Sequence, residues 1–123
     1  NTTVQNYMTR SVNFLPRFLV NPNHLVIDGK EFWLSFTATF ECGTVSRTDL
    51  LMLDDGVLCE ALEFWQEADE SPSIACRVTL YTKVDTDLWK AAGDTVFVDA
   101  GCIVEPVPFH VPYVGHVMIP PNL

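Results

Sequence analysis

Acidic side chains are the residues of this sequence best placed to do chemistry. Two turn-like segments, residues 54–56 and 85–87, each carry a pair of carboxylates. Calcium takes about six to eight oxygen ligands, so two such turns could share one ion if the fold brought them together. Asp in a turn or at a helix start is also common for local reasons, and the twelve-residue calcium loop is absent. We therefore expect no cofactor, with calcium as the weaker alternative at Asp54, Asp55, Asp85 and Asp87.

No enzymatic signature accompanies these carboxylates. The sequence lacks a GxSxG nucleophile motif, and its 6 glycines are isolated, so it offers no phosphate-binding loop. His110 and His116 fall on a segment expected to be one strand, where six residues of strand rise place them roughly 20 Å apart. That separation is too large for a shared metal. We expect a protein that is not an enzyme.

Aromatic residues near the acidic loops indicate a contact surface instead. Tyr81 falls on the polar side of an alternating segment, and Trp65 comes just before an acidic run. For Trp33 and Trp89 we expect core packing. Aromatic side chains are enriched in interfaces and ligand sites. The candidate contacts for a protein receptor or a glycan are Tyr81, Trp65, Glu67, Asp69 and Glu70.

Composition limits the class of protein. The 123 residues contain 7 Lys and Arg against 16 Asp and Glu, a net charge of −9, and 48% are hydrophobic. Scattered basic residues cannot create the field that phosphates need, so we do not expect nucleic acid as a partner. The apolar content is too high for a disordered acidic tail. No apolar run approaches the roughly 18 residues of a membrane span, and we expect no membrane insertion.

Short strands must position these side chains. Alternation predicts strands over residues 33–42 and 74–84, and Asp28-Gly29 predicts a hairpin just before the first of them. Residues 56–66 fit either a helix or a strand, and their neighbours favour a strand. Residues 87–92 have a cap-like start and a Gly stop, which predicts a short helix. Further strands are expected over residues 95–98, 101–105 and 109–118, with a bend at Ala100-Gly101.

These elements together predict an all-β fold. We expect residues 1–123 to form a single domain, an antiparallel β-sandwich or barrel of jelly-roll type with one or two short helical turns. Cys42, Cys59, Cys76 and Cys102 include no CxxC pair, and the alternation places Cys42 and Cys76 on inward faces. Buried free thiols in a reducing compartment are favoured, while one or two disulfides remain the alternative.

The last eighteen residues differ from the rest of the chain. Residues 41–105 carry fourteen acidic against four basic residues, a net charge of −10, whereas residues 106–123 carry no charge and five prolines. An uncharged apolar tail is an aggregation liability when it is free, so we expect it to lie against its own domain or another subunit. The candidate dimer interface is Phe109, Val111, Tyr113, Val117 and Met118.

Two segments carry a resemblance to a known family. The run VDTDLWKAAGD and the ending EPVPFHVPYVGHVMIPPNL resemble the C-terminal protruding domain of the capsid protein of crustacean nodaviruses. The resemblance covers the whole chain and implies a β-structured spike on the virion surface. It implies three partners: a second copy in a homodimer, the shell domain of the same coat protein, and a host surface receptor or glycan. The alternative is a free-standing carbohydrate-binding β-sandwich, either dependent on calcium or independent of it.

Overall fold

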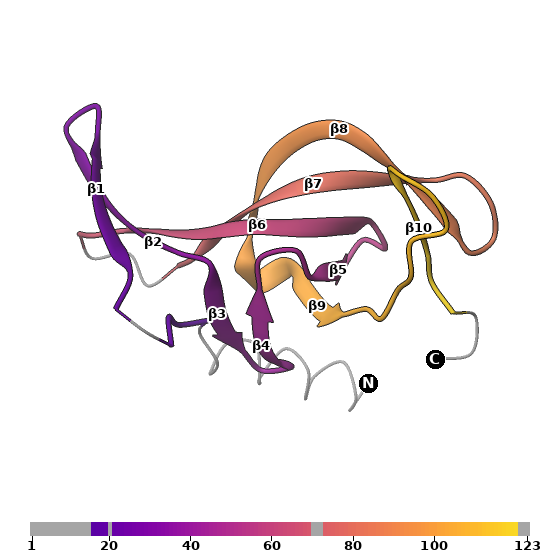
Figure 1. The fold of residues 1–123 in the computed structure, drawn as a ribbon. Coiled ribbons are helices and arrows are strands. Elements are labelled where there is room, and N and C mark those ends of the chain that lie inside the picture. The colour runs from indigo at the N-terminus through magenta and orange to yellow at the C-terminus, as the bar shows by residue number, and fades with distance from the viewer. Residues whose placement is uncertain (1–15, 20, 70–72, 121–123) are drawn as a thin grey trace.

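A computed structural model describes residues 16–19, 21–69 and 73–120 (Figure 1). Its regular structure consists of antiparallel strands and one short 3-10 turn, which confirms the predicted all-β class. The elements in chain order are β1 (Asn23–Ile27), β2 (Lys30–Ser35), β3 (Thr37–Phe40), β4 (Gly43–Ser46), β5 (Leu50–Leu53), β6 (Leu58–Glu67), β7 (Ala75–Lys83), β8 (Leu88–Asp99), η1 (Ala100–Cys102), β9 (Ile103–Pro106) and β10 (His116–Met118).

Strand β6 organises the main sheet. The order across this sheet is β1-β2-β6-β7-β8-β10, while β5 pairs with both β6 and β9, and β3 and β4 form a separate hairpin. Because β7 occupies one edge of β6, the two strands β5 and β2 share the other edge. In Figure 1, β3, β4, β5 and β9 lie below the long strands β6, β7 and β8. The molecule is therefore sandwich-like.

The core lies between these two layers. Alternate residues of β6 and β7, including Phe64, Cys76 and Val78, are fully buried and pack against Ala38 and Val45 of the small hairpin. Period-two alternation sends their sequence neighbours to the opposite face of the sheet. We call that opposite face, whose residues are mostly half-buried or exposed, the open face.

The hairpin predicted at Asp28-Gly29 is confirmed. Asp28 has φ 51° and Gly29 has φ 79°, so both residues adopt the left-handed conformation of a type I′ turn. Ile27 pairs with Lys30 directly across it. The strand predicted for residues 74–84 and the strand reading of residues 56–66 are also confirmed, by β7 and β6.

The helix predicted for residues 87–92 is wrong. Residues 88–92 instead begin β8, where Trp89 pairs with Lys83 and Lys90 with Thr82. Gly93, with φ 85°, lies inside this long strand and does not end a helix. Pairing with β7 outweighs the local capping pattern. The helical turn that the structure does contain is η1, at the bend that the sequence predicted.

The single strand predicted for residues 33–42 is also wrong. The chain turns after Ser35, whose Oγ accepts a hydrogen bond of 3.2 Å from the Thr37 amide, so β2 and β3 belong to different sheets. The turn inverts the expected faces at this point: Ser35 is buried and Phe36 is 47% exposed. Cys42 is exposed at the β3–β4 turn, contrary to expectation, whereas Cys76 is buried as predicted.

Candidate functional site

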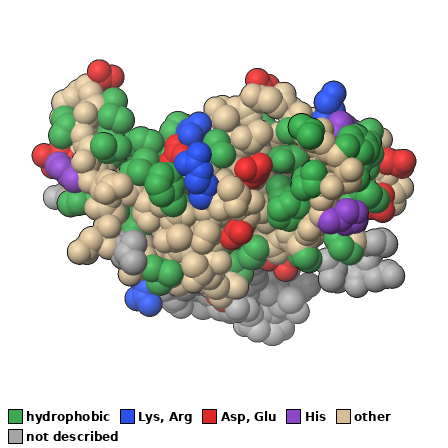
Figure 2. Space-filling view, viewed as in Figure 1, with side chains coloured by type: hydrophobic (Ala, Val, Ile, Leu, Met, Phe, Trp, Pro, Cys, Tyr) green, Lys and Arg blue, Asp and Glu red, His purple; other side chains and the backbone are tan. Residues whose placement is uncertain are grey.

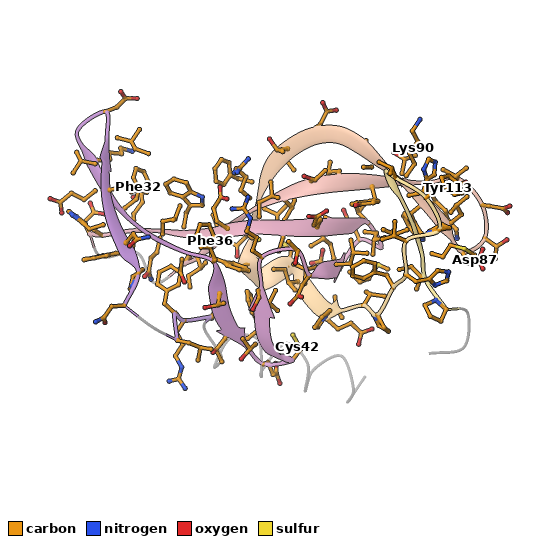
Figure 3. All side chains as sticks on the ribbon, viewed as in Figure 1. Phe32, Phe36, Cys42, Asp87, Lys90 and Tyr113 are labelled. Carbon is orange, nitrogen blue, oxygen red and sulfur yellow. The ribbon has the colours of Figure 1, made fainter. Side chains whose placement is uncertain are left out.

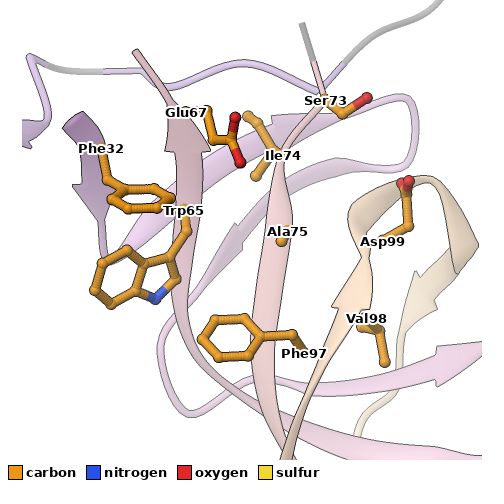
Figure 4. Close-up of a pocket in the computed structure, with 9 residues that line it drawn as sticks. All are labelled: Phe32, Trp65, Glu67, Ser73, Ile74, Ala75, Phe97, Val98 and Asp99. Carbon is orange, nitrogen blue, oxygen red and sulfur yellow. The ribbon is translucent and has the colours of Figure 1, made fainter. Parts of the chain in front are cut away.

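A groove lies on the open face of the main sheet, where β2, β6, β7 and β8 run side by side. Its volume is about 400 Å³, and aromatic and aliphatic side chains make most of its lining (Figure 4). Two carboxylates, those of Glu67 and Asp99, join this lining. The residues around the groove are Phe32, Trp65, Glu67, Ser73, Ile74, Ala75, Phe97, Val98 and Asp99.

Strand register explains why the sheet is hollow at this point. Trp65 of β6 pairs with Ala75 of β7, and Ala75 pairs with Asp99 of β8. Cross-strand partners project to the same face, so the Ala75 methyl lies between two larger side chains. Figure 4 shows Ala75 between Trp65 on one side and Asp99 on the other. The small side chain forms the floor of the groove.

Three aromatic rings form one wall. The Trp65 ring centroid lies 6.0 Å from that of Phe32, at an interplanar angle of 83°, and 6.2 Å from that of Phe97, at 75°. Edge-to-face contacts of this kind are favourable and orient the rings. Phe97 is nevertheless 59% exposed. The chain thus keeps a large apolar side chain in water beside two ordered aromatic rings.

An ion-pair cluster occupies the neighbouring row of the same face. Arg77 donates to Glu63 from Nε and from Nη2, the latter over 3.0 Å, and Arg47 Nη1 lies 3.7 Å from Glu63 Oε2. The hydrogen bond from Arg77 lowers the pKa of Glu63, against the effect of burial, and the same bond raises the pKa of Arg77. Trp65 Nε1 also donates to Glu63, over 3.4 Å, which helps to fix the indole.

The predicted contact residues divide between several places. Trp65 and Glu67 lie in the groove, and Asp69 lines a second hollow that also includes Glu67. Tyr81 lies apart from both. Its hydroxyl donates to Glu60 over 3.2 Å, and burial, with the nearby Glu60 charge, raises its pKa to about 12. Glu70 falls outside the described residues.

Sequence reasoning missed four important groove residues. Alternation in the segment 95–98 separates Phe97 from its neighbours Val96 and Val98, so the sequence did contain a signal for Phe97. No comparable signal marks the others, because the groove is formed by strands that are distant along the chain. The missed residues are Phe32, Ala75, Phe97 and Asp99.

The acidic turns have local roles. Asp55 Oδ1 accepts from the Val57 amide over 3.1 Å, and Asp85 Oδ1 accepts from the Thr86 amide over 2.8 Å. Asp54 and Asp55 follow β5, while Asp85 and Asp87 lie between β7 and β8. Within the described residues, no three His, Cys, Asp or Glu side chains form a group that could hold a metal ion. The carboxylates of the two turns therefore do not form such a group in this structure.

The candidate dimer residues do not all face outward. Phe109, Val111 and Tyr113 are exposed, and the neighbouring Val114 is 96% exposed. Val117 is only 4% exposed because it packs inside its own chain, so it cannot serve as a contact for a partner. The expected strand 109–118 folds back on itself, since His110 and half-buried Met118 form an antiparallel bridge.

This exposed tail lies at one end of the molecule. Figure 3 shows Tyr113 at the same end as Lys90 and Asp87, with Phe32 towards the other end. The Tyr113 ring contacts the His116 ring in a tilted arrangement, with centroids 4.4 Å apart at an interplanar angle of 48°, which helps to order the loop. Figure 2 shows hydrophobic side chains gathered at this end and again over the β1–β2 hairpin. We call the exposed residues Phe109, Val111, Tyr113 and Val114 the tail patch.

Comparison with known proteins gives no relative. No family model, curated protein or solved structure matches this chain.

The part of the chain that the structure describes contains no helix with the length and apolar character needed to cross a bilayer.

Proposed function

We propose that this chain is a surface-attachment domain, the protruding domain of a virus coat protein of the crustacean nodavirus type. The observation that carries the proposal is the tail patch. Large apolar side chains are exposed together in a segment without charged residues, although the whole chain carries a net charge of −9. Homodimer interfaces are more apolar than ordinary surface and use the same patch on both subunits. A second copy of the chain is the partner that this patch would accept.

The arrangement of the two surfaces supports this role. Figure 3 places Phe32, a wall of the groove, away from Tyr113 of the tail patch. A dimer formed through the tail patch would therefore keep both grooves accessible. Two accessible grooves in one spike increase the effective concentration of the second contact on a cell surface. In a virion, the shell domain of the same coat protein would hold the domain in place.

Sedimentation velocity at micromolar concentration tests dimerisation. We expect a dimer for the unmodified chain and a monomer for Val111→Asp and Tyr113→Asp, because a charge buried in an apolar interface is costly. Val26→Asp is the matched control, since Val26 is 62% exposed, close to the 58% of Val111, but lies in the β1–β2 hairpin. A monomer at all concentrations, or equal dissociation by Val26→Asp, would contradict the proposed interface.

Competition for host cells tests attachment. We expect an excess of the domain to reduce binding of virus-like particles to crustacean cells, and a monomeric Tyr113→Asp variant to compete less well. Unchanged particle binding would count against an attachment role.

A free-standing carbohydrate-binding β-sandwich is the second candidate, and the aromatic groove favours it. Such a module would bind sugars as a monomer and would not compete with virus-like particles. Calcium would not be needed for the sugar contact in this groove, because the turns at Asp54 and Asp85 do not line it. Glycan binding before and after chelation with EDTA tests that point.

A further inference from the structure

We propose that the groove on the open face of β2, β6, β7 and β8 binds an uncharged saccharide. This inference rests on the attachment role proposed above and names the ligand class for it. The proposal starts from shape: a hollow of about 400 Å³ falls within the range of small-ligand sites, and its floor is the small side chain of Ala75. Residues on rigid paired strands surround this floor, so the site is largely preformed.

The apolar wall suits the carbon-bound hydrogens of a sugar ring. Phe32 and Phe97 flank Trp65 with centroids about 6 Å away, and the indole is also held by its hydrogen bond to Glu63. Rings that are already ordered lose little conformational entropy when they bind a ligand. Covering Phe97, which is 59% exposed, would add the favourable burial of a large aromatic side chain.

The polar part of the lining accepts hydrogen bonds. Figure 4 shows the carboxylates of Glu67 and Asp99 on opposite sides of Ala75. Asp99 Oδ1 accepts from the Gly101 amide over 2.8 Å, which holds this side chain at the rim of the groove. An ionised carboxylate only accepts hydrogen bonds, so the ligand must supply donors. Hydroxyl groups of a sugar are such donors.

The charged side chains around the groove favour an uncharged ligand. The two carboxylates in the lining would repel a sialic acid, a sulfated glycan or a phosphate. On the neighbouring row, Arg77 and Arg47 both face the single carboxylate of Glu63, which leaves an excess of positive charge beside Phe97. The groove and this row together carry three carboxylates and two guanidinium groups, so their net charge of −1 offers only weak attraction to a basic peptide, the other ligand that aromatic rings and carboxylates could recognise. A neutral molecule rich in hydroxyl groups is compatible with both sides.

The test uses NMR and calorimetry on the whole chain with defined probes. The neutral probes are lactose, N-acetyllactosamine, chitotriose and mannotriose, the anionic probe is 3′-sialyllactose, and the cationic probe is tetralysine. We expect at least one neutral sugar to shift the indole N–H signal of Trp65 while leaving those of Trp33 and Trp89 in place. Sialyllactose should bind more weakly than lactose, and tetralysine should leave the Trp65 signal unchanged.

Two variants locate the site without affecting the core. Phe97→Ala removes an exposed wall and should weaken binding by about tenfold or more. Ala75→Ile fills the floor with a residue that suits a strand and should also weaken binding. Val26→Ala is the matched control, because Val26 is 62% exposed, close to the 59% of Phe97, and lies outside the groove lining. Its affinity per site should equal that of the unmodified chain.

The outcomes separate this inference from the proposed function. If the domain dimerises and blocks particle attachment, but no neutral sugar shifts Trp65, the saccharide inference is overturned and the attachment role stands. Binding of tetralysine at Trp65 would overturn it in favour of a basic protein partner. Sugar binding that survives both Phe97→Ala and Ala75→Ile would place the ligand elsewhere. Sugar binding by a chain that never dimerises would support the saccharide inference and contradict the proposed role as a dimeric spike domain.

Discussion

The buried carboxylate of Glu63 gives the sharpest test of how the open face is held together. We consider Glu63→Gln, which keeps the shape of the side chain but removes its charge. Glu63 is only 5% exposed, and Arg77 donates two hydrogen bonds to its carboxylate. In the variant, the amide nitrogen of Gln must face one of these donors, so one hydrogen bond is lost and the other is weakened.

The expected cost follows from these contacts. A hydrogen bond to a charged group contributes about 1.5–3 kcal/mol, and the 33% exposure of the Arg77 side chain favours the lower end. We therefore expect Glu63→Gln to lower the free energy of unfolding by about 2–3 kcal/mol. Arg47→Met should cost less than about 1 kcal/mol, because Arg47 is half exposed and its Nη1 lies 3.7 Å from the carboxylate.

Urea denaturation at several pH values measures both effects. The pKa of Glu63 is lowered in the folded chain, so its stabilisation is present above the unfolded-state value of about 4.3. This stabilisation is lost as the pH falls towards the folded-state pKa. Glu63→Gln should lack this acid-dependent loss. Glu67→Gln is the control, since Glu67 is an exposed carboxylate on the same strand. Equal stability of Glu63→Gln and the unmodified chain at pH 7 would refute the reasoning.

Three further predictions concern the turn, the thiols and the tail. Gly29→Ala should destabilise the domain by about 1 kcal/mol in thermal unfolding, because Gly29 has φ 79°. In labelling with a thiol reagent at pH 8, Cys42 should react first because it is exposed, and Cys59 and Cys76 only on unfolding, because burial raises their pKa to about 12. Val117→Ala should cost about 2 kcal/mol in urea denaturation because it leaves a cavity, whereas a Val117 free for a partner would cost almost nothing.

Local signals were sufficient for part of the fold. Asp28-Gly29 specifies its hairpin because two adjacent residues adopt the left-handed conformation that the turn needs. The alternation around Cys76 specifies β7 because one face is buried along much of the strand. The predictions failed where distant pairing decides the outcome. The alternation of apolar and polar residues continues through the turn after Ser35, so the sequence gives no sign of that turn. At residues 87–92, pairing with β7 overrides the helix that the local sequence predicts.

The candidate site was predictable only in part, for a related reason. Trp65 and Glu67 were identified because an aromatic residue beside an acidic run is visible in one segment. The groove around them depends on the register that sets Trp65, Ala75 and Asp99 in one row. Strand order and register are properties of the folded sheet. The role of Ala75 as a floor therefore has no counterpart in the sequence.

The position of the groove on a paired sheet has a consequence for how its specificity can change by substitution. Most of its lining comes from strands, and in β7 the groove residue Ala75 is followed by the core residue Cys76. A substitution at Ala75 can change the groove while the neighbouring core position, Cys76, stays the same. The ligand specificity of the groove can thus change through single substitutions, without the loop insertions that reshape many binding sites. For the proposed spike domain, a difference in host range between viral strains would then be found at groove positions of β7 and β8.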